Sequence, residues 1–139
     1  MQTRIKWIEN VMYAGQSSNG HSVIMDGPPE YGGKNMGFRP MEMLLLGLGG
    51  CSAFYVMRIL KKARQPVLDC EVLVDAQREK EDPKLFNHIQ LHFILTGEEI
   101  NPKQVQRAIE LSSEKYCSVS LMLSNTVEIE MSFEIQEKK

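Results

Sequence analysis

The sequence contains little cysteine, few aromatic residues and almost no excess of either charge. Its three cysteines, Cys51, Cys70 and Cys117, are an odd number without the paired spacing of a zinc site, so we expect neither a disulfide framework nor a bound metal. The net charge of -2 offers no basic surface to a phosphate backbone, which argues against a nucleic-acid partner. Chemistry at individual thiols is what remains.

Targeting signals are also missing. The opening residues Met1–Trp7 lack the apolar stretch and small-residue cleavage site of a secretion signal, which predicts a cytoplasmic protein with reduced cysteines. A length of 139 residues with 42% apolar and 24% charged residues is typical of one globular domain. No internal repeat or linker interrupts the chain, so the sequence predicts a single domain over residues 1–139.

The N-terminal part has the pattern of a β-hairpin followed by a loop. Residues 3–13 resemble a half-buried strand, Gly15–Gly20 has turn composition, and residues 21–26 can return as the second strand. Seven of the fourteen residues in Gly27–Pro40 are glycine or proline. A loop of this length is more often functional than idle.

A long apolar helix is predicted over Met41–Leu60. Pro40 suits the first helical position, and Glu42 suits the first turn because it faces the positive end of the helix dipole. Only Glu42 and Arg58 are charged in this stretch, so a membrane span is an alternative. Charges near both ends and strand-rich flanks favour a buried central helix and no membrane. Three glycines predict close approach by a partner helix: Gly47, Gly49 and Gly50.

The C-terminal part alternates strands and a second helix. Cys70–Gln77 and Phe86–Thr96 have the pattern of a hairpin. Asn101-Pro102 is a helix start, and apolar residues at helical spacing carry that helix to Cys117. Residues 127–136 alternate without error, which we interpret as an antiparallel strand with one wet face.

Cys51 lies well inside the predicted central helix. An apolar wall raises the pKa of a thiol, whereas a nearby guanidinium lowers it and activates the sulfur. Arg58 lies two turns along the helix, roughly 10 Å away, and Arg39 lies just before the helix. A buried structural cysteine and a reactive thiol both fit these residues.

Cys117 is placed where a second reactive thiol has room to move. A thiolate that attacks a peroxide becomes a sulfenic acid, which another thiol must capture before oxidation becomes irreversible. The remaining candidates have plainer explanations. Cys70 opens a predicted strand, and we interpret it as an inert core cysteine. His88 and His92 are four residues apart on one strand face, and we interpret them as surface side chains.

Two segments resemble the OsmC/Ohr family. Pro40–Cys51, with the letters PMEMLLLGLGGC, is similar to the family's central-helix motif, in which a proline opens the helix and a cysteine eleven residues later is the peroxidatic thiol. The second family cysteine resembles Cys117 within Glu114–Ser120, and the order of predicted elements agrees along nearly the whole chain. The resemblance implies an α+β fold with antiparallel sheets around a long buried central helix, in an intertwined homodimer with active sites at its interface.

The resemblance also implies a mechanism and partners. The Cys51 thiolate would reduce an organic hydroperoxide to its alcohol, Cys117 would close a disulfide, and a small dithiol or lipoyl-bearing protein would reopen it. This chemistry needs no metal, flavin or other cofactor. The alternative is a non-catalytic dimeric domain that binds a small apolar ligand or senses oxidants through its thiols.

The chain departs from the family pattern at two positions. This variant motif resembles the YhfA-like branch of the family, whose members keep both cysteines with altered surroundings. Met41 stands where family peroxidases keep a catalytic glutamate, and Glu42 follows one place later, about 100° around the helix. The family arginine comes from the N-terminal hairpin turn, where Gly15–Gly20 has none. Glu42 and Arg39 are therefore the candidate catalytic partners of the thiol, with His21 as a substitute for the arginine.

Overall fold

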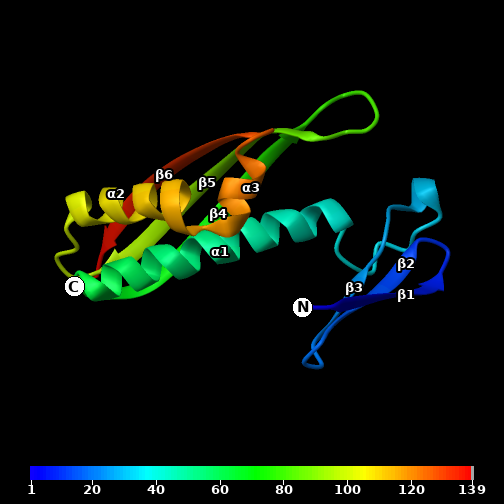
Figure 1. Cartoon of the computed structure of the whole chain (residues 1–139), viewed down its shortest axis with the longest axis horizontal. Coiled ribbons are helices and arrows are strands. Elements are labelled where there is room, and N and C mark those ends of the chain that lie inside the picture. The colour runs from blue at the N-terminus through cyan, green and yellow to red at the C-terminus, as the bar shows by residue number, and fades with distance from the viewer. Residues whose placement is uncertain (139) are drawn as a thin grey trace. The chain divides into compact units, whose positions relative to one another are not determined.

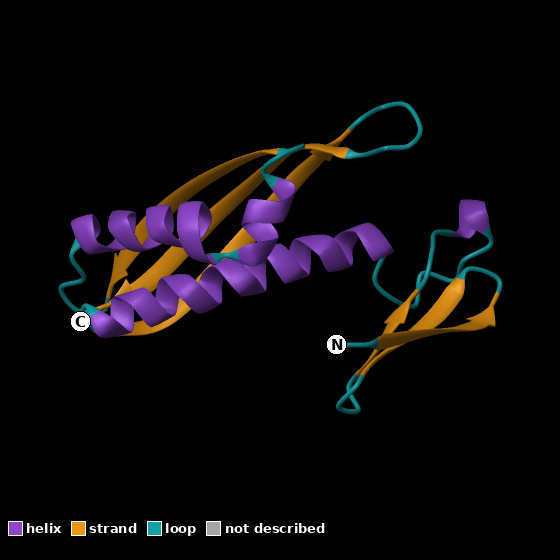
Figure 2. Ribbon diagram, viewed as in Figure 1, coloured by secondary structure: helices purple, strands orange, loops and turns teal. Residues whose placement is uncertain are grey.

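The computed structural model describes residues 1–138 and contains two three-stranded sheets and one long helix (Figures 1 and 2). The chain divides into two compact units, Met1–Leu44 and the residues from Leu45 onward. The first carries a small sheet, and the second carries the larger sheet with the helices that cover it. This mixture confirms the predicted α+β class.

The N-terminal sheet is an antiparallel meander of β1 (Thr3–Glu9), β2 (Met12–Ser17) and β3 (Ser22–Met25). The sequence predicted only a two-stranded hairpin with its turn at Gly15–Gly20, and that prediction is wrong by one strand. The extra turn begins at Asn10, whose φ of 48° is a left-handed conformation that asparagine tolerates. It divides the first apolar segment into β1 and β2.

One buried carboxylate organises the loop that follows β3. Asp26 is 2% exposed and is the one buried residue among residues 1–44. Burial acts against its charged form, but three backbone N–H groups and the Arg39 guanidinium outweigh that effect and hold the pKa of Asp26 below its ordinary value. The three N–H donors, 2.8 to 3.1 Å away, are those of Gly27, Lys34 and Met36.

The long helix α1 spans Pro40–Lys62, and its start at Pro40 confirms the prediction. Glu42 caps the first turn, because its carboxylate accepts a hydrogen bond of 2.8 Å from the backbone N–H of Arg39. Length and apolar composition of α1 also fit a membrane span. One stripe of the helix is nevertheless buried within the second unit. The stripe consists of Leu48, Gly49, Ser52, Val56 and Leu60.

The larger sheet has the order β4 (Val67–Arg78), β5 (Phe86–Gly97) and β6 (Glu128–Glu137). The predicted hairpin of β4 and β5 is confirmed, since the two strands pair antiparallel. The prediction that the last strand is antiparallel is wrong, because β6 runs parallel to β5. The alternation of apolar and polar residues is present as predicted, but a two-residue period does not encode strand direction.

The helical segment after β5 is broken where the sequence predicted one continuous helix up to Cys117. It consists of α2 (Pro102–Leu111), a π-helical turn η2 (Ser112–Tyr116) and a short helix α3 (Ser118–Leu123). The backbone N–H of Cys117 donates to the carbonyl of Ser112 five residues earlier, at 2.7 Å. The chain then turns, so that Cys117 becomes the N-cap of α3 instead of the end of a longer helix.

The core of the second unit lies between the sheet and the helices. Helices α1 and α2 lie over the same face of the sheet (Figures 1 and 2). Alternate residues of β5 from Ile89 onward point to this face and are buried: Ile89, Leu91, Phe93 and Leu95. Phe86, before a register irregularity, is also buried.

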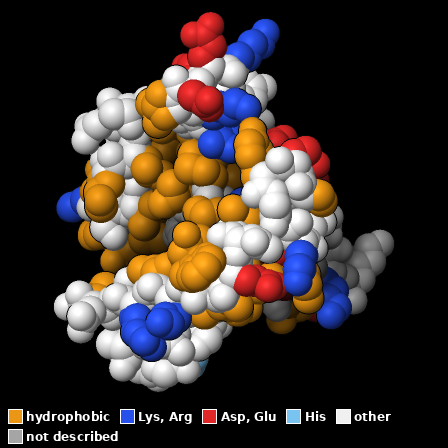
Figure 3. Space-filling model, turned by 90° about the vertical axis from the view of Figure 1, so that its right-hand side faces the viewer, with side chains coloured by type: hydrophobic (Ala, Val, Ile, Leu, Met, Phe, Trp, Pro, Cys, Tyr) orange, Lys and Arg blue, Asp and Glu red, His pale blue; other side chains and the backbone are white. Residues whose placement is uncertain are grey.

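Many large apolar side chains remain exposed in the described chain. Hydrophobic side chains make up much of the surface visible in Figure 3. On β1, Ile5 and Trp7 are exposed by 58% and 59%, although the sequence predicted a half-buried strand. The second unit also exposes apolar residues, including Leu46, Phe54 and Leu73.

Candidate thiol site

The second unit brings Cys51 and Cys117 together. Cys51 lies on α1, and Cys117 lies at the junction between η2 and α3. Both are free thiols, of which Cys117 is fully buried and Cys51 is partly exposed. The two cysteines that the sequence selected are thus neighbours, one partly accessible to solvent and the other buried.

Cys51 is surrounded by hydrogen-bond donors from the start of α3. Its Sγ lies 4.0 Å from the Oγ of Ser118. Burial acts to raise the pKa of Cys51, but hydrogen bonds from the Cys117 thiol, the N–H of Val119 and both the hydroxyl and N–H of Ser118 more than offset this effect. The pKa of Cys51 is therefore lowered, which favours the thiolate.

Cys117 has the opposite tendency. Burial raises its pKa, and the hydrogen bond to Cys51 and the charge of that thiolate raise it further. The Ser52 hydroxyl, 3.5 Å from the Cys117 sulfur, and the Ser120 N–H, 3.4 Å away, only partly oppose this rise. The two pKa values therefore shift in opposite directions, and Cys51 is the more easily ionised thiol of the pair.

Buried serines hold this arrangement in place. The Ser112 hydroxyl donates to the backbone carbonyl of Ser52 at 3.2 Å, which ties η2 to α1. Ser52 and Ser112 are fully buried, and Ser120 is 2% exposed. Sequence reasoning did not select these serines. The available signal was a cluster of serines on both sides of Cys117, next to a helix with Ser52 directly after Cys51.

The other two predicted site residues lie in the Met1–Leu44 unit. Arg39 donates through Nη2 to Asn35 at 2.8 Å and through Nη1 to the backbone carbonyl of Asp26 at 3.4 Å. Glu42 accepts the Arg39 backbone N–H, as described above. Both residues therefore stabilise the loop and the helix start, and their catalytic roles stay predictions.

Cys70 is separate from this pair on β4. It is half-buried, and burial, together with the nearby Asp69 carboxylate, raises its pKa. An elevated pKa makes a thiol a poor nucleophile at neutral pH. Cys70 is thus not the core residue that the sequence predicted, and its lack of reactivity stays a prediction.

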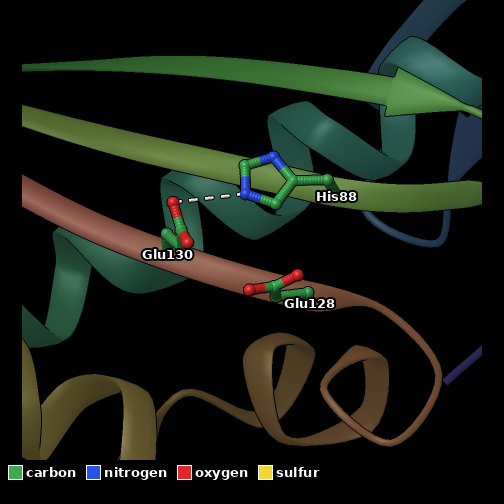
Figure 4. Close-up of side chains that lie close together, drawn as sticks. All are labelled: His88, Glu128 and Glu130. Atoms are coloured by element: carbon green, nitrogen blue, oxygen red, sulfur yellow. Dashed lines mark ion pairs between the residues drawn. The ribbon is translucent and has the colours of Figure 1, made fainter.

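Three side chains on the face of the larger sheet opposite its buried core have the atom types of a metal site (Figure 4). In the part of the chain that the structure describes, the ligand atoms of His88, Glu128 and Glu130 lie within 4.8 Å of one another. His88 already pairs with Glu130 at 3.2 Å, and both carboxylates are exposed. His92, on the same face, bonds the Ser132 hydroxyl at 2.7 Å. An ordinary pairing of histidine with glutamate across parallel strands accounts for the cluster.

Comparison with known proteins identifies relatives over nearly the whole chain. The family model described as OsmC-like protein matches residues 32–132. Protein YhfA of Escherichia coli (strain K12) is 50% identical over 138 residues, covering 97% of this chain and 98% of YhfA.

Solved structures share the fold. A hypothetical protein from Aquifex aeolicus VF5 has a TM-score of 0.87 at 28% identity, covering 99% of this chain and 97% of its own. The organic hydroperoxide resistance protein OsmC of Legionella pneumophila has a TM-score of 0.75 at 16% identity, with coverage of 96% and 95%.

Proposed function

Because the chain belongs to the OsmC-like protein family, as its sequence predicted, we propose that it is a cysteine-based peroxidase that reduces organic hydroperoxides. In this proposal Cys51 is the peroxidatic thiol and Cys117 the resolving thiol. The observation that carries the proposal is the geometry of the pair: the Cys51 sulfur lies 4.0 Å from the hydroxyl of Ser118, which follows Cys117, and Ser52, which follows Cys51, bonds the Cys117 sulfur at 3.5 Å. The opposite pKa shifts of the two thiols add support. The family relationship to hydroperoxide resistance proteins adds support.

The first step uses the ionised sulfur. The Cys51 thiolate attacks the terminal oxygen of the hydroperoxide, so that an S–O bond forms and the O–O bond breaks. The departing alkoxide takes a proton from water and leaves as the alcohol. The sulfur is oxidised to a sulfenic acid by two electrons.

The second step uses the buried thiol. The Cys117 sulfur attacks the Cys51 sulfur, an S–S bond forms, and the hydroxide that leaves combines with the Cys117 proton to give water. A dithiol, free or carried on a lipoyl protein, then reduces the disulfide by thiol–disulfide exchange and is itself oxidised. A cytoplasmic location, where thiols are kept reduced, suits this cycle.

The proposal is tested by following cumene hydroperoxide consumption with dithiothreitol as reductant. We expect Cys51→Ser to abolish consumption and Cys117→Ser to accumulate a sulfenic acid that dimedone traps. Cys70→Ser is the matched control and should leave the rate unchanged, because Cys70 lies outside the pair. Reaction of the wild-type thiols no faster than free cysteine would rule out the peroxidase.

One observation favours a second function, an oxidant sensor that is not an enzyme. The groups that hydrogen-bond Cys51 are a thiol, a hydroxyl and backbone N–H groups, without a carboxylate or a guanidinium among them in residues 1–138. Such a site would form the Cys51–Cys117 disulfide once for each exposure to oxidant. Its catalytic turnover of peroxide would be slow. Slow turnover combined with rapid single oxidation distinguishes the sensor from the peroxidase.

We also propose that the working form is a homodimer, since proteins of this family are commonly dimeric. Residues 1–44 bury only Asp26, and a three-stranded sheet without an apolar core is not stable by itself. A second copy of the chain that covers β1 would bury Ile5 and Trp7. Light scattering during size-exclusion chromatography should give twice the chain mass of 15.9 kDa, and a monomer would refute this assembly.

A further inference from the structure

A cleft of about 440 Å³ lies between α1 and the α2–η2 segment of the second unit. Tyr55, Arg58 and Lys62 line its α1 wall, and Arg107 and Tyr116 line the facing wall. The rings of Tyr55 and Tyr116 stack, with centroids 6.0 Å apart and an angle of 21° between planes. The cleft thus combines an aromatic wall with three cations.

The three cations lack acidic partners in the described part of the chain. The ion pairs found among residues 1–138 do not include Arg58, Lys62 or Arg107, and none of the described residues that line the cleft is acidic. Arg58 and Lys62 stand one turn apart on α1, where like charges repel each other. The chain as a whole has a net charge of -2, so this positive charge is confined to the cleft. An anionic ligand would neutralise it.

The cationic cleft and the reactive sulfur lie along one stripe of α1. Tyr55, Arg58 and Lys62 follow Cys51 by four, seven and eleven residues. A helix turns by about 100° per residue, so all three side chains leave the helix within roughly 40° of the direction of Cys51. A rise of about 1.5 Å per residue places Arg58 and Lys62 roughly 10 and 16 Å farther along the helix axis than Cys51. Tyr116, on the other wall, directly precedes Cys117.

We propose that the cleft binds the carboxylate end of an elongated small molecule whose apolar stem extends along α1 to Cys51. The guanidinium groups of Arg58 and Arg107 match a carboxylate in geometry and charge. The apolar and tyrosine-lined walls suit a hydrocarbon stem. The reaction at Cys51 rests on the proposed peroxidase function, whereas the binding itself does not.

Two kinds of molecule share this chemistry. One is a substrate, a hydroperoxide that also carries a carboxylate. The other is a reductant, a dithiol that carries a carboxylate and opens the Cys51–Cys117 disulfide by exchange, leaving two protein thiols and an oxidised dithiol. Both place a sulfur-reactive group at Cys51 and a negative charge in the cleft.

Binding is tested first, without any peroxide, by calorimetric titration of the reduced protein with decanoate and with uncharged decanol. We expect Arg107→Gln to weaken decanoate binding about tenfold or more, because it removes a charge-assisted hydrogen bond, and to leave decanol unaffected. Lys61→Gln is the matched control, since it removes the same charge from α1 outside this cleft. Decanoate should also slow the alkylation of Cys51 by iodoacetamide in the wild type.

Kinetics then separate substrate from reductant. If the ligand is the substrate, Arg107→Gln lowers kcat/KM for a hydroperoxy fatty acid but not for its methyl ester. If it is the reductant, the same variant slows disulfide reduction by dihydrolipoate but not by dihydrolipoamide. Either result supports the proposal.

Failed binding or a ligand that does not reach the thiol would overturn the proposal. Decanoate that binds no better than decanol, or equally well to Arg107→Gln, would show that the cations do not bind a carboxylate. Charge-dependent binding that leaves Cys51 alkylation and both kinetic comparisons unchanged would show that the ligand does not reach the thiol. A wild type without activity toward any hydroperoxide would refute the peroxidase alone, because titration and alkylation still decide the binding.

Discussion

The Ser52 hydroxyl donates a hydrogen bond of 3.5 Å to the sulfur of Cys117, and Ser52 directly follows Cys51 on α1. The same stretch of helix therefore presents one thiol to the outside and holds the second thiol through a neighbouring hydroxyl. Ser52 is fully buried, so this hydrogen bond lies in the protein interior. A hydrogen bond there is electrostatically stronger than one at the surface.

Replacing Ser52 by alanine should impair resolution more than peroxide attack. The Ser52 hydrogen bond lowers the pKa of Cys117, so its loss raises that pKa further and slows disulfide formation. A hydrogen bond of about 1 kcal/mol corresponds to about a fivefold slower step. Stopped-flow measurement with dimedone trapping should show a longer-lived sulfenic acid in this variant. Ser113→Ala is the control and should behave as wild type, because the Ser113 hydroxyl donates to the Glu110 carbonyl.

Alkylation of Cys51 should depend on pH with an inflection below that of free cysteine, because hydrogen bonds lower its pKa despite burial. Only the thiolate reacts, so the rate falls as the pH drops through this lowered pKa. Cys117→Ala removes the thiol donor and should move the inflection upward. Mass spectrometry resolves each site, and the inflection for Cys70 should lie above that of free cysteine, since its pKa is raised. An unshifted Cys51 profile would contradict the proposed thiolate.

The three helical glycines should respond differently to alanine. A Cβ at Gly49 would lie 2.9 Å from Cγ2 of Val74, a side chain with little rotameric freedom, so Gly49→Ala should destabilise the fold by about 1–3 kcal/mol. A Cβ at Gly47 or Gly50 would meet nothing within 4 Å. Alanine there should stabilise the isolated chain by up to about 1 kcal/mol in urea unfolding.

Dimerisation adds a second readout to the glycine series. If a partner helix approaches Gly47 and Gly50, alanine at these positions should weaken the dimer in analytical ultracentrifugation while the fold is retained. A dimer of unchanged affinity would refute the predicted helix contact.

Asp26→Asn should loosen the loop after β3 and remove part of its acid sensitivity. The folded-state pKa of Asp26 is depressed, so its stabilising effect is complete at neutral pH and is lost as the pH falls through that folded pKa. We expect the variant to have a lower Tm at neutral pH and the two proteins to converge in acid. Parallel melting curves with a constant difference at all pH values would contradict this role.

Glu42→Gln separates helix capping from catalysis. Glutamine can still accept the Arg39 backbone N–H, so the Tm should be nearly unchanged. If Glu42 also serves the reaction, as the sequence predicted, cumene hydroperoxide turnover should fall about tenfold or more. Full activity of this variant, or of Arg39→Gln, would leave these residues with a structural role only.

Much of this architecture follows from local sequence signals. Pro40 and Asn101 predicted the starts of α1 and α2, and the Asn101 side chain indeed accepts the Lys103 N–H at 2.9 Å. The alternation after residue 127 predicted the apolar face of β6. Helix starts and strand faces depend on neighbouring residues, which is why sequence reasoning succeeds there.

Features that depend on distant residues were missed. Strand β6 pairs parallel with β5, and the π-helical turn before Cys117 begins at Ser112, whose hydroxyl bonds a carbonyl of α1. Asp26 had no signal in the sequence beyond an acidic residue before a glycine-rich loop. The thiol pair was predicted from the family resemblance, whereas the serines that support it became evident only in three dimensions.

The parallel pairing of β5 and β6 also orders events during folding. Strands β4 and β5 are adjacent in the chain and can pair as soon as both exist, whereas β6 must first be carried across by residues 98–127, and such long-range pairing is slow. Cys117 travels on that crossover. A newly made chain therefore carries Cys51 for some time before Cys117 reaches it, and an oxidant present during synthesis meets a thiol that has no second protein sulfur beside it.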